Sequence, residues 1–354
     1  MHVLIVKVSS LGDVIHTLPA LTDAMRAIPQ IKFDWVVEEA FTEIPAWHKA
    51  VNKVIPVAFR RWKKNILFML FNREYKNFKK NLKSTDYDLI IDAQGLLKSG
   101  LICSMAQGKK VVGLDKESIR EKAANRFYDE SYPVSRQQHA VERTRILFAQ
   151  ALGYGLDGQS LDYGISLQQS EQKENNSGKS LYFLHGTTWQ TKLWPEQYWI
   201  ELANKAVSEG YQIKLLWGNE EEQQRANHIA ALVPNVTVMS RLSLTEIAGQ
   251  LLQADIIVAV DTGLAHLAAA LDRPTVALYG ASDPAKTGTY GKNQIHLSAS
   301  LSCSPCLNRK CHYQGQDLNE TEKESIFAVD PPCFSTVAPD RVWKNIESLT
   351  QAAH

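Results

Sequence analysis

A pattern of short apolar strands alternating with helical stretches runs along this chain twice, with a polar break between the two runs. In the first run, strands are predicted at 2–8, 33–38, 52–57, 88–93 and 110–113, with helices at 17–28 and 137–151. Such alternation indicates parallel strands joined by crossover helices. The break is QQSEQKENNSGK, residues 168–179, which contains no apolar residue and is typical of a linker.

The second run predicts another α/β domain of similar size. Its strands are expected at 180–185, 212–218, 236–239, 254–260 and 275–280, with helices near 195–208 and at 264–271. We therefore expect domains at 1–167 and 180–338, followed by a helix in 339–354. Ligands of parallel sheets bind beyond the carboxyl ends of the strands, so two facing domains would form a cleft between them.

Composition excludes several classes of protein. Lys and Arg number 39 against 38 Asp and Glu, whereas general nucleic-acid binders are strongly basic. No apolar run reaches the roughly 18 residues of a membrane span. The apolar start, MHVLIVKVSS, ends in a turn rather than a cleavage site. The 5 cysteines do not resemble a secreted disulfide framework, so a cytoplasmic location is expected.

Polar residues follow two strands of the second domain at the end where ligands bind. Thr187, Thr188 and Lys192 come after the first strand. Hydroxyls and a lysine suit phosphate oxygens, but an ordinary loop with a solvated lysine fits equally well. Glu222 follows the next strand, at the start of a helix. Its carboxylate could accept both hydroxyls of a ribose, or it could simply favour the helix dipole.

A third strand of this domain ends in VAVDTGLAHLAAAL. Asp261 ends the strand, and Thr262 and Gly263 open a helix whose N–H groups suit an anion. His266 lies one turn further along. The alternative is that Asp261 or Thr262 caps the helix while His266 packs within it. The triplet DTG also occurs in aspartic proteases, but those enzymes need two such carboxylates in an antiparallel fold.

Together, the three strand ends predict a site for a nucleotide diphosphate. No GxGxxG follows a strand, which disfavours a nicotinamide cofactor. The motif DYD at 86–88 matches the DxD metal motif of sugar transferases, but it precedes its strand, at the wrong end for a ligand. We therefore expect a metal-independent reaction in which Lys192 and a helix start neutralise the leaving phosphate.

Three motifs together resemble the bacterial heptosyltransferases of lipopolysaccharide core synthesis, glycosyltransferase family 9. They are KVSSLGDVIHTLPAL, HGTTWQTKLWP and VDTGLAHLAAALDRPTVALYG. The segments FDWVVEEAF, VIPVAFRRWKK, DAQGLLKS and QQHAVERTR extend the resemblance over nearly the whole chain, with most likeness to the heptosyltransferase I branch. The resemblance implies a GT-B fold, in which two Rossmann-like domains face each other across a cleft. It also implies inverting transfer of L-glycero-D-manno-heptose from ADP-heptose to Kdo on lipid A, without a cofactor.

The resemblance further implies roles for individual residues. Asp13 would be the catalytic base of a single displacement, although the residues alone slightly favour a helix-capping acid. Ser10 and Gly12 would let the sugar and acceptor approach closely. Lys192 would be catalytic through the leaving diphosphate. The donor would be bound by Thr187, Thr188, Lys192, Glu222, Asp261, Thr262, Gly263 and His266.

The first domain carries features expected of an acceptor side. Basic residues with aromatic residues between them crowd 59–84, and a second basic set follows in 120–145. A solvated face is the commonest meaning of such runs, and RNA binding is a further alternative. In a chain of balanced charge they suggest contact with the anionic groups of Kdo–lipid A at the inner membrane, worth about 1 kcal/mol per residue. The expected acceptor residues are Arg60, Arg61, Lys63, Lys64, Arg120, His139 and Arg143.

The segment 299–335 departs from the heptosyltransferase I pattern and is more like the tail of heptosyltransferase II-type enzymes. Its cysteines could bind a structural zinc, form a disulfide or remain free thiols; they are Cys303, Cys306, Cys311 and Cys333. This tail leaves open an enzyme that adds to an existing heptose. Other rivals are a GT-B enzyme using another nucleotide sugar, such as a UDP-sugar transferase or 2-epimerase, and a basic membrane-surface or RNA-binding module.

Overall fold

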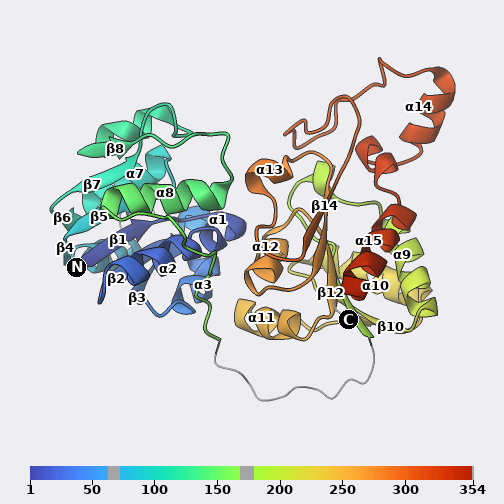
Figure 1. Ribbon diagram of the computed structural model, residues 1–354, viewed down its shortest axis with the longest axis horizontal. Helices are drawn as coiled ribbons and strands as arrows, with labels where there is room; N and C mark the ends of the chain where they lie inside the picture. The colour runs from blue at the N-terminus through green and yellow to red at the C-terminus, as the bar shows by residue number, and fades with distance from the viewer. Residues whose placement is uncertain (63–71, 168–178, 353–354) are drawn as a thin grey trace. The chain divides into compact units, whose positions relative to one another are not determined.

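The structure is a computed structural model that describes residues 1–62, 72–167 and 179–352. The chain divides into two compact units, Met1–Leu167 and Gln168–His354 (Figure 1). The predicted acceptor residues Lys63 and Lys64, and nearly all of the predicted linker, lie outside the described residues. Among the helices of the described ranges, none is long and apolar enough to cross a membrane.

The first unit is built on a parallel sheet with the strand order β3–β2–β1–β5–β7–β8. Its strands are β1 (His2–Val6), β2 (Lys32–Glu38), β3 (Val51–Val57), β5 (Leu89–Asp92), β7 (Val111–Leu114) and β8 (Glu130–Tyr132). Its helices are α1 (Leu11–Ile15), α2 (Leu18–Ala27), α3 (Glu43–Ala46), α4 (Phe59–Trp62), α6 (Arg73–Leu82), α7 (Leu97–Met105) and α8 (Ala140–Leu152), with 3-10 turns η1 (Glu39–Phe41) and η2 (Lys122–Phe127). The apolar residues of β1 are fully buried from Val3 onward, as expected of a parallel strand covered on both faces.

The motif DYD lies at the amino end of this sheet, as predicted. Asp86–Tyr87 form the short strand β4, which pairs with β6 (Gln107–Gly108). The Asp88 carboxylate accepts a hydrogen bond at 2.9 Å from the backbone N–H of His2, the first residue of β1, and pairs with Lys109 at 2.6 Å. Asp88 is therefore engaged at the end of the sheet opposite to the one where ligands bind.

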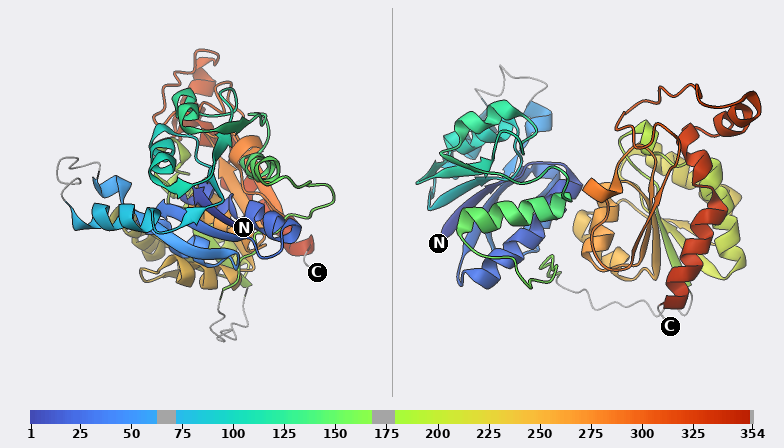
Figure 2. Two further views of the ribbon diagram at one scale, coloured as in Figure 1. Left: turned by 90° about the vertical axis from the view of Figure 1, so that its left-hand side faces the viewer. Right: turned by 45° about the horizontal axis from the view of Figure 1, so that its top comes forward.

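The second unit repeats the same sheet, with the parallel strand order β11–β10–β9–β12–β13–β14. Its strands are β9 (Lys179–Leu184), β10 (Tyr211–Leu215), β11 (Val236–Val238), β12 (Ile256–Val260), β13 (Thr275–Tyr279) and β14 (Gln294–Ser298). Its helices are α9 (Glu196–Ser208), α10 (Glu220–Leu232), α11 (Leu244–Leu252), α12 (Gly263–Ala270), α13 (Pro284–Thr287), α14 (Glu320–Phe327) and α15 (Pro339–Ala352), with 3-10 turns η3 (Gln190–Lys192) and η4 (Pro332–Thr336). Helices α11 and α12 cover one face of the sheet, and α9, α10 and α15 cover the other (Figures 1 and 2).

Both sheets have the strand order of a doubly wound dinucleotide-binding fold, in which the chain reverses direction across the sheet after its third strand. The prediction of two Rossmann-like α/β domains is thus confirmed at the level of the fold. The reversal falls between β1 and β5 in the first unit, and between β9 and β12 in the second. Such switch points are where ligands of these sheets bind, so the residues after β1, β9 and β12 are the ones to inspect.

Helix α15 is part of the core of the second unit. Val342, Trp343 and Ile346 are buried in the same cluster as β9 and β12 side chains. The Trp194 indole N–H, in the loop before α9, donates to the backbone oxygen of Val337 at 2.8 Å. The final helix predicted from the sequence is therefore integral to the second unit.

A buried ion pair joins α2 to α8 on one face of the first sheet. The Arg145 Nε donates to the Asp23 carboxylate at 2.7 Å, and the two side chains are 7% and 1% exposed. Arg145 also pairs with Glu142 at 2.9 Å and donates to the backbone oxygen of Gln159 at 3.1 Å. Because the buried guanidinium has partners on several sides, removing one of them leaves charge without its counterion.

We expect Asp23→Ala to lower the free energy of unfolding of the first unit by about 3 kcal/mol, the cost of breaking a buried pair. The matched control is Arg26→Ala. Arg26 lies on the same helix as Asp23, and the change breaks its exposed ion pair with Asp162. That change should cost less than about 1 kcal/mol. Amide hydrogen exchange of β1 under increasing denaturant measures both variants. Equal costs would contradict a dominant role for the Asp23–Arg145 pair.

Candidate functional site

Three strand ends of the second unit converge on Asp261. Asp261 directly follows β12, which hydrogen-bonds to β9 on one side and to β13 on the other. Thr187, after β9, donates its hydroxyl to the backbone oxygen of Asp261 at 3.0 Å. Ser282, after β13, donates its hydroxyl to the Asp261 carboxylate. Residues from three neighbouring strands thus meet at the switch point of the sheet, as the sequence predicted for Thr187 and Asp261.

Lys192 completes this arrangement with a positive charge. Its Nζ lies 2.6 Å from the Asp261 Oδ2, and the two side chains are 17% and 7% exposed. The ammonium also lies 4.4 Å from the centroid of the Trp189 ring, in a cation–π contact. His266, on α12, places its Nε2 3.8 Å from the other Asp261 oxygen. We call these residues the Asp261 cluster: Thr187, Lys192, Asp261, His266 and Ser282.

The first backbone N–H groups of α12 lie beside the Asp261 cluster. Thr262 occupies the N-cap position with an extended backbone, but its side chain makes no capping hydrogen bond. The Asp261 carboxylate is engaged with Lys192 and Ser282. Thr262 is therefore the N-cap residue, as one alternative had it, but neither side chain caps the helix through a hydrogen bond. The opening N–H groups of α12, from Gly263 onward, add a partial positive charge that suits an anion.

Glu222 lies over the loop that follows β9. Its Oε2 accepts a hydrogen bond from the backbone N–H of Gly218 at 2.7 Å, while Asn219 caps α10 by accepting from the Glu222 N–H at 3.0 Å. A Cβ added at Gly186 would lie 2.3 Å from the Glu222 carboxyl carbon, so a larger residue here would displace this carboxylate. Glu222 thus approaches the residue before Thr187, while Thr188 is exposed in the same loop.

Asp13 lies after β1, the strand of the first unit that corresponds to β9 of the second. Its Oδ2 accepts hydrogen bonds from the backbone N–H of Ser10 at 2.7 Å and from the Ser10 hydroxyl at 2.8 Å. The carboxylate therefore does close a capping box on α1, and Gly12 is buried within that helix. All the hydrogen bonds that the structure gives this carboxylate use Oδ2. The cap therefore uses one oxygen of the carboxylate, and Asp13 as a whole is half-buried.

Two further polar groups lie near Asp13. Lys7 is buried at the end of β1, and its Nζ donates to the backbone oxygen of Ala93 at 2.9 Å. Burial lowers the pKa of Lys7, and the carboxylates of Asp13 and Asp92 oppose that shift. The side-chain oxygen of Gln94 accepts from the backbone N–H groups of Val8 and Ser9 at 3.0 Å, which holds the turn before Asp13 in place.

The predicted acceptor residues of the first unit have varied surroundings. Arg61 pairs with Glu39 at 2.9 Å and with Glu74 at 2.6 Å, and these hydrogen bonds raise its pKa. The Arg60 guanidinium lies 5.2 Å from the Phe41 ring centroid, and Arg120 is exposed.

The two predicted acceptor residues near α8 are more enclosed. His139 is buried and caps the helix, accepting from the backbone N–H of Val141 at 3.2 Å. Its ring lies edge-on to that of His16, with centroids 5.4 Å apart. Arg143 donates to the backbone oxygen of Ser118 at 2.5 Å, and burial lowers its pKa. Both side chains therefore have local structural contacts as well as any acceptor role.

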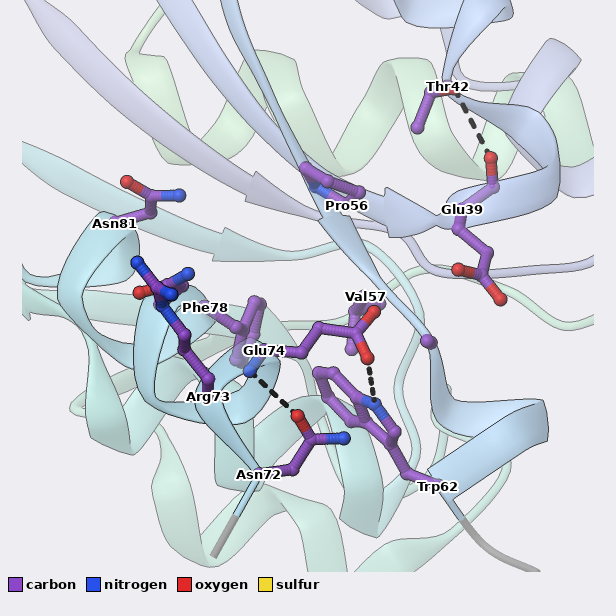
Figure 3. Close-up of a pocket in the computed structure, with 12 residues that line it drawn as sticks. Glu39, Thr42, Pro56, Val57, Trp62, Asn72, Arg73, Glu74, Phe78 and Asn81 are labelled. Atoms are coloured by element: carbon purple, nitrogen blue, oxygen red, sulfur yellow. Dashed lines mark hydrogen bonds between the residues drawn. The ribbon is translucent and has the colours of Figure 1, made fainter. Parts of the chain in front are cut away.

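A pocket of about 710 Å³ lies in the first unit beside α4 and α6 (Figure 3). Glu74 points into it and accepts a hydrogen bond at 3.4 Å from the indole N–H of Trp62. Glu39 lines it as well, so both carboxylate partners of Arg61 belong to the lining. All the residues that line this pocket belong to the first unit, whereas the predicted donor residues belong to the second.

The four cysteines of 299–335 are free thiols in the structure. In the described ranges, which include all four, no group of three or more His, Cys, Asp or Glu side chains could hold a metal ion. Burial and the neighbouring thiols raise the pKa of Cys333 to about 12, which keeps it protonated at neutral pH.

Comparison with known proteins assigns the chain to a family. The profile of Glycosyltransferase family 9 (heptosyltransferase) matches residues 75–316. Lipopolysaccharide heptosyltransferase 1 of Pseudomonas aeruginosa is 52% identical over 355 residues, 99% of both chains. The structure of Escherichia coli heptosyltransferase WaaC with ADP has 47% identity and a TM-score of 0.79, and the match covers 85% of this chain and 94% of that one. WaaC with ADP-2-deoxy-2-fluoro heptose gives a TM-score of 0.77 over the same shares.

The two Rossmann-like domains therefore form a fold of the GT-B class, with the Asp261 cluster at the switch point of the second. The chain belongs to glycosyltransferase family 9, and it is a heptosyltransferase of lipopolysaccharide core synthesis. The match to the P. aeruginosa relative spans 99% of both chains, so the segment 299–335 falls within a heptosyltransferase 1 alignment. The match to Escherichia coli heptosyltransferase 1 covers 83% of this chain, so the departure of this segment from that branch stays a prediction.

We expect Gly186→Ala to destabilise the second unit by about 0.5–1.5 kcal/mol, because the added methyl group displaces the flexible end of Glu222 and breaks its hydrogen bond with the Gly218 N–H. The control is Gly249→Ala within α11, where a Cβ meets nothing within 4 Å. That change should stabilise the helix by about 0.5–1 kcal/mol. Hydrogen exchange of β9 amides measures both effects. A neutral Gly186→Ala would show that Glu222 does not need its present position.

Proposed function

We propose that this enzyme transfers L-glycero-D-manno-heptose from ADP-heptose to a Kdo residue of the lipid A–Kdo inner core, with inversion at the anomeric carbon. The observation that carries the proposal is the Lys192–Asp261 pair at the switch point of the second unit, beside the start of α12. Nucleotide phosphates bind at this position in doubly wound folds. The likeness to WaaC structures with ADP and with an ADP-heptose analogue supports the choice of nucleotide.

When the donor binds, Lys192 exchanges its ion pair with Asp261 for a contact with the donor diphosphate. In the free enzyme, Lys192 is neutralised by Asp261 at 2.6 Å. A phosphate oxygen competes for the same ammonium, while Thr187, Thr188 and the N–H groups at Thr262 and Gly263 offer further donors. Glu222 accepts hydrogen bonds from the ribose hydroxyls, and His266 faces the phosphates and sugar from α12. When the bond between C1 and the phosphate oxygen breaks, these groups stabilise the charge that develops on ADP.

Asp13 acts as the base of a single displacement. The acceptor hydroxyl oxygen forms a bond to C1 of the heptose as the C1–phosphate bond breaks, and its proton passes to Asp13. The Ser10 hydrogen bonds fix Oδ2 of the carboxylate, so Oδ1 is the oxygen that takes the proton. Ser10 and Gly12 border the acceptor. The base is on the first unit and the donor site is on the second, so the reaction requires both.

Basic residues of the first unit bind the anionic acceptor. Arg60 and Arg120 are exposed, and the ion pairs of the 53% exposed Arg61 are weak enough to be exchanged for acceptor anions. Lys63, Lys64, His139 and Arg143 extend this set. Together they would hold a cytoplasmic enzyme at the anionic surface of the inner membrane, where its lipid acceptor lies.

The decisive test is ADP release from ADP-heptose, with and without a heptoseless Kdo–lipid A acceptor. We expect release that depends on the acceptor. ADP binding without release on this acceptor, but with release on an already heptosylated core, would favour the heptosyltransferase II-type alternative. Failure to bind ADP, with binding of a UDP-sugar, anionic vesicles or RNA instead, would overturn the donor assignment.

We expect Asp13→Asn to reduce turnover by at least about 10²-fold, the usual contribution of a general base. Asparagine can still accept the Ser10 hydrogen bonds, so helix α1 should remain capped. ADP affinity, measured by calorimetry, should be unchanged because the donor residues lie in the other unit. Ser10→Ala serves as the control for a purely structural effect of the cap. Retained turnover in Asp13→Asn would remove this carboxylate as the base.

We expect Lys192→Ala to weaken ADP binding about 10- to 100-fold and to lower kcat, because a charge-assisted contact is lost and the Asp261 charge is left without its partner. Lys192→Ala combined with Asp261→Asn separates the two causes, since removing the unpaired charge should restore part of the affinity. Lys205→Ala, an exposed lysine paired with Asp340, is the control for overall charge. An unchanged KM for ADP-heptose in Lys192→Ala would place the phosphates elsewhere.

A further inference from the structure

The cysteine-bearing segment is attached to the Asp261 cluster at two points. The Thr191 hydroxyl donates to the backbone oxygen of Asn308 at 2.5 Å. The backbone N–H of Leu307 donates to the backbone oxygen of Ala281 at 2.8 Å. Thr191 directly precedes Lys192 and Ala281 directly precedes Ser282, so both anchors adjoin residues of the cluster. Residues 307–308 are therefore held beside the proposed phosphate site.

These anchors bring Arg309 to the Trp189 ring. The Arg309 guanidinium carbon lies 5.3 Å from the ring centroid, and the Lys192 ammonium lies 4.4 Å from the same centroid. A single indole thus contacts two cations from distant parts of the chain. The two cations differ in their counterions, because Lys192 is paired with Asp261. Among the residues that the structure describes, no carboxylate pairs with the exposed Arg309.

The charge of the ligand calls for a cation beyond Lys192. A nucleoside diphosphate sugar carries a negative charge on each phosphate, and the departing diphosphate gains one more. Lys192 and Asp261 cancel each other, so the cluster itself offers little net positive charge. An arginine presents a planar fork of N–H donors that matches two phosphate oxygens at once. Arg309 has the chemistry and the position to supply this.

We propose that Arg309 is a second diphosphate-binding residue, which contacts the terminal phosphate of the nucleotide and stabilises the leaving diphosphate. This inference rests on the proposed function of the Asp261 cluster. It also gives the segment 299–335 a role in the reaction, because the segment carries this cation to the site. The Trp189 ring holds the guanidinium ready in the free enzyme.

Arg309→Ala tests the proposal, with Lys310→Ala as the matched control from the next position of the same exposed loop. We expect Arg309→Ala to weaken ADP binding about tenfold, a typical loss for one charged hydrogen-bonding group, and to lower kcat. Binding of AMP, which lacks the terminal phosphate, should change less than twofold. Lys310→Ala should leave both affinities within twofold, and Arg309→Lys should recover part of the loss. Wild-type ADP affinity and kcat in Arg309→Ala would overturn the inference.

Failure of the inference about Arg309 can be distinguished from failure of the proposed function. A wild-type enzyme that neither binds ADP nor releases it from ADP-heptose would refute the function itself. A wild-type enzyme that does both, with an unaffected Arg309→Ala variant, would refute only the role of Arg309.

A second variant tests how Arg309 is held. Thr191→Val removes the hydroxyl that donates to Asn308 but leaves every charge in place. It should weaken ADP binding in the wild-type background and have no further effect in Arg309→Ala, because the two changes act on one contact. Thr191→Ser, which retains the hydroxyl, should behave as the wild type. Fully additive losses would contradict the proposed anchoring.

Discussion

The proposed donor site depends on one enclosed ion pair, between Lys192 and Asp261. A carboxylate that is 7% exposed needs a cation or hydrogen-bond donors, and here Lys192 and Ser282 supply both. The pair in turn orders its surroundings: Thr187 is tied to the Asp261 backbone, and Lys192 lies against Trp189. Its lysine is held in position before any ligand arrives, so less ordering remains to be done on binding.

Each unit places an acid after a strand at its switch point, β1 in the first unit and β12 in the second, yet the two acids are used differently. After β1, Asp13 turns back to the Ser10 N–H and hydroxyl and completes its own helix start. After β12, Asp261 leaves α12 without a side-chain cap and faces the neighbouring strand ends instead. The same topology therefore offers one helix start that is occupied by its own acid and another that is available to an anion.

Much of this was predictable from the sequence, because the buried parallel strands are unbroken apolar runs such as LIV in β1 and IIVAV in β12. The strands β8 and β14 were missed, since ESY and QIHLS are short and lack such runs. The capping box of Asp13 was visible as a serine three residues before an acid. Lys192 and Asp261 are far apart in the sequence, so their contact could be found only from the structure. No local sequence pattern marked Ser282 or Arg309 as part of the site, because their contacts are also with residues far away in the sequence.

The packing of α15 has a consequence for the order in which the protein is made. Trp343 and Ile346 complete the core beneath β9 and β12, and the Val337 oxygen just before α15 holds Trp194. These residues come after every strand of the second unit in chain order. During synthesis the first unit can fold while the rest is still being translated. The second unit cannot complete its core until residues 337–346 have been made.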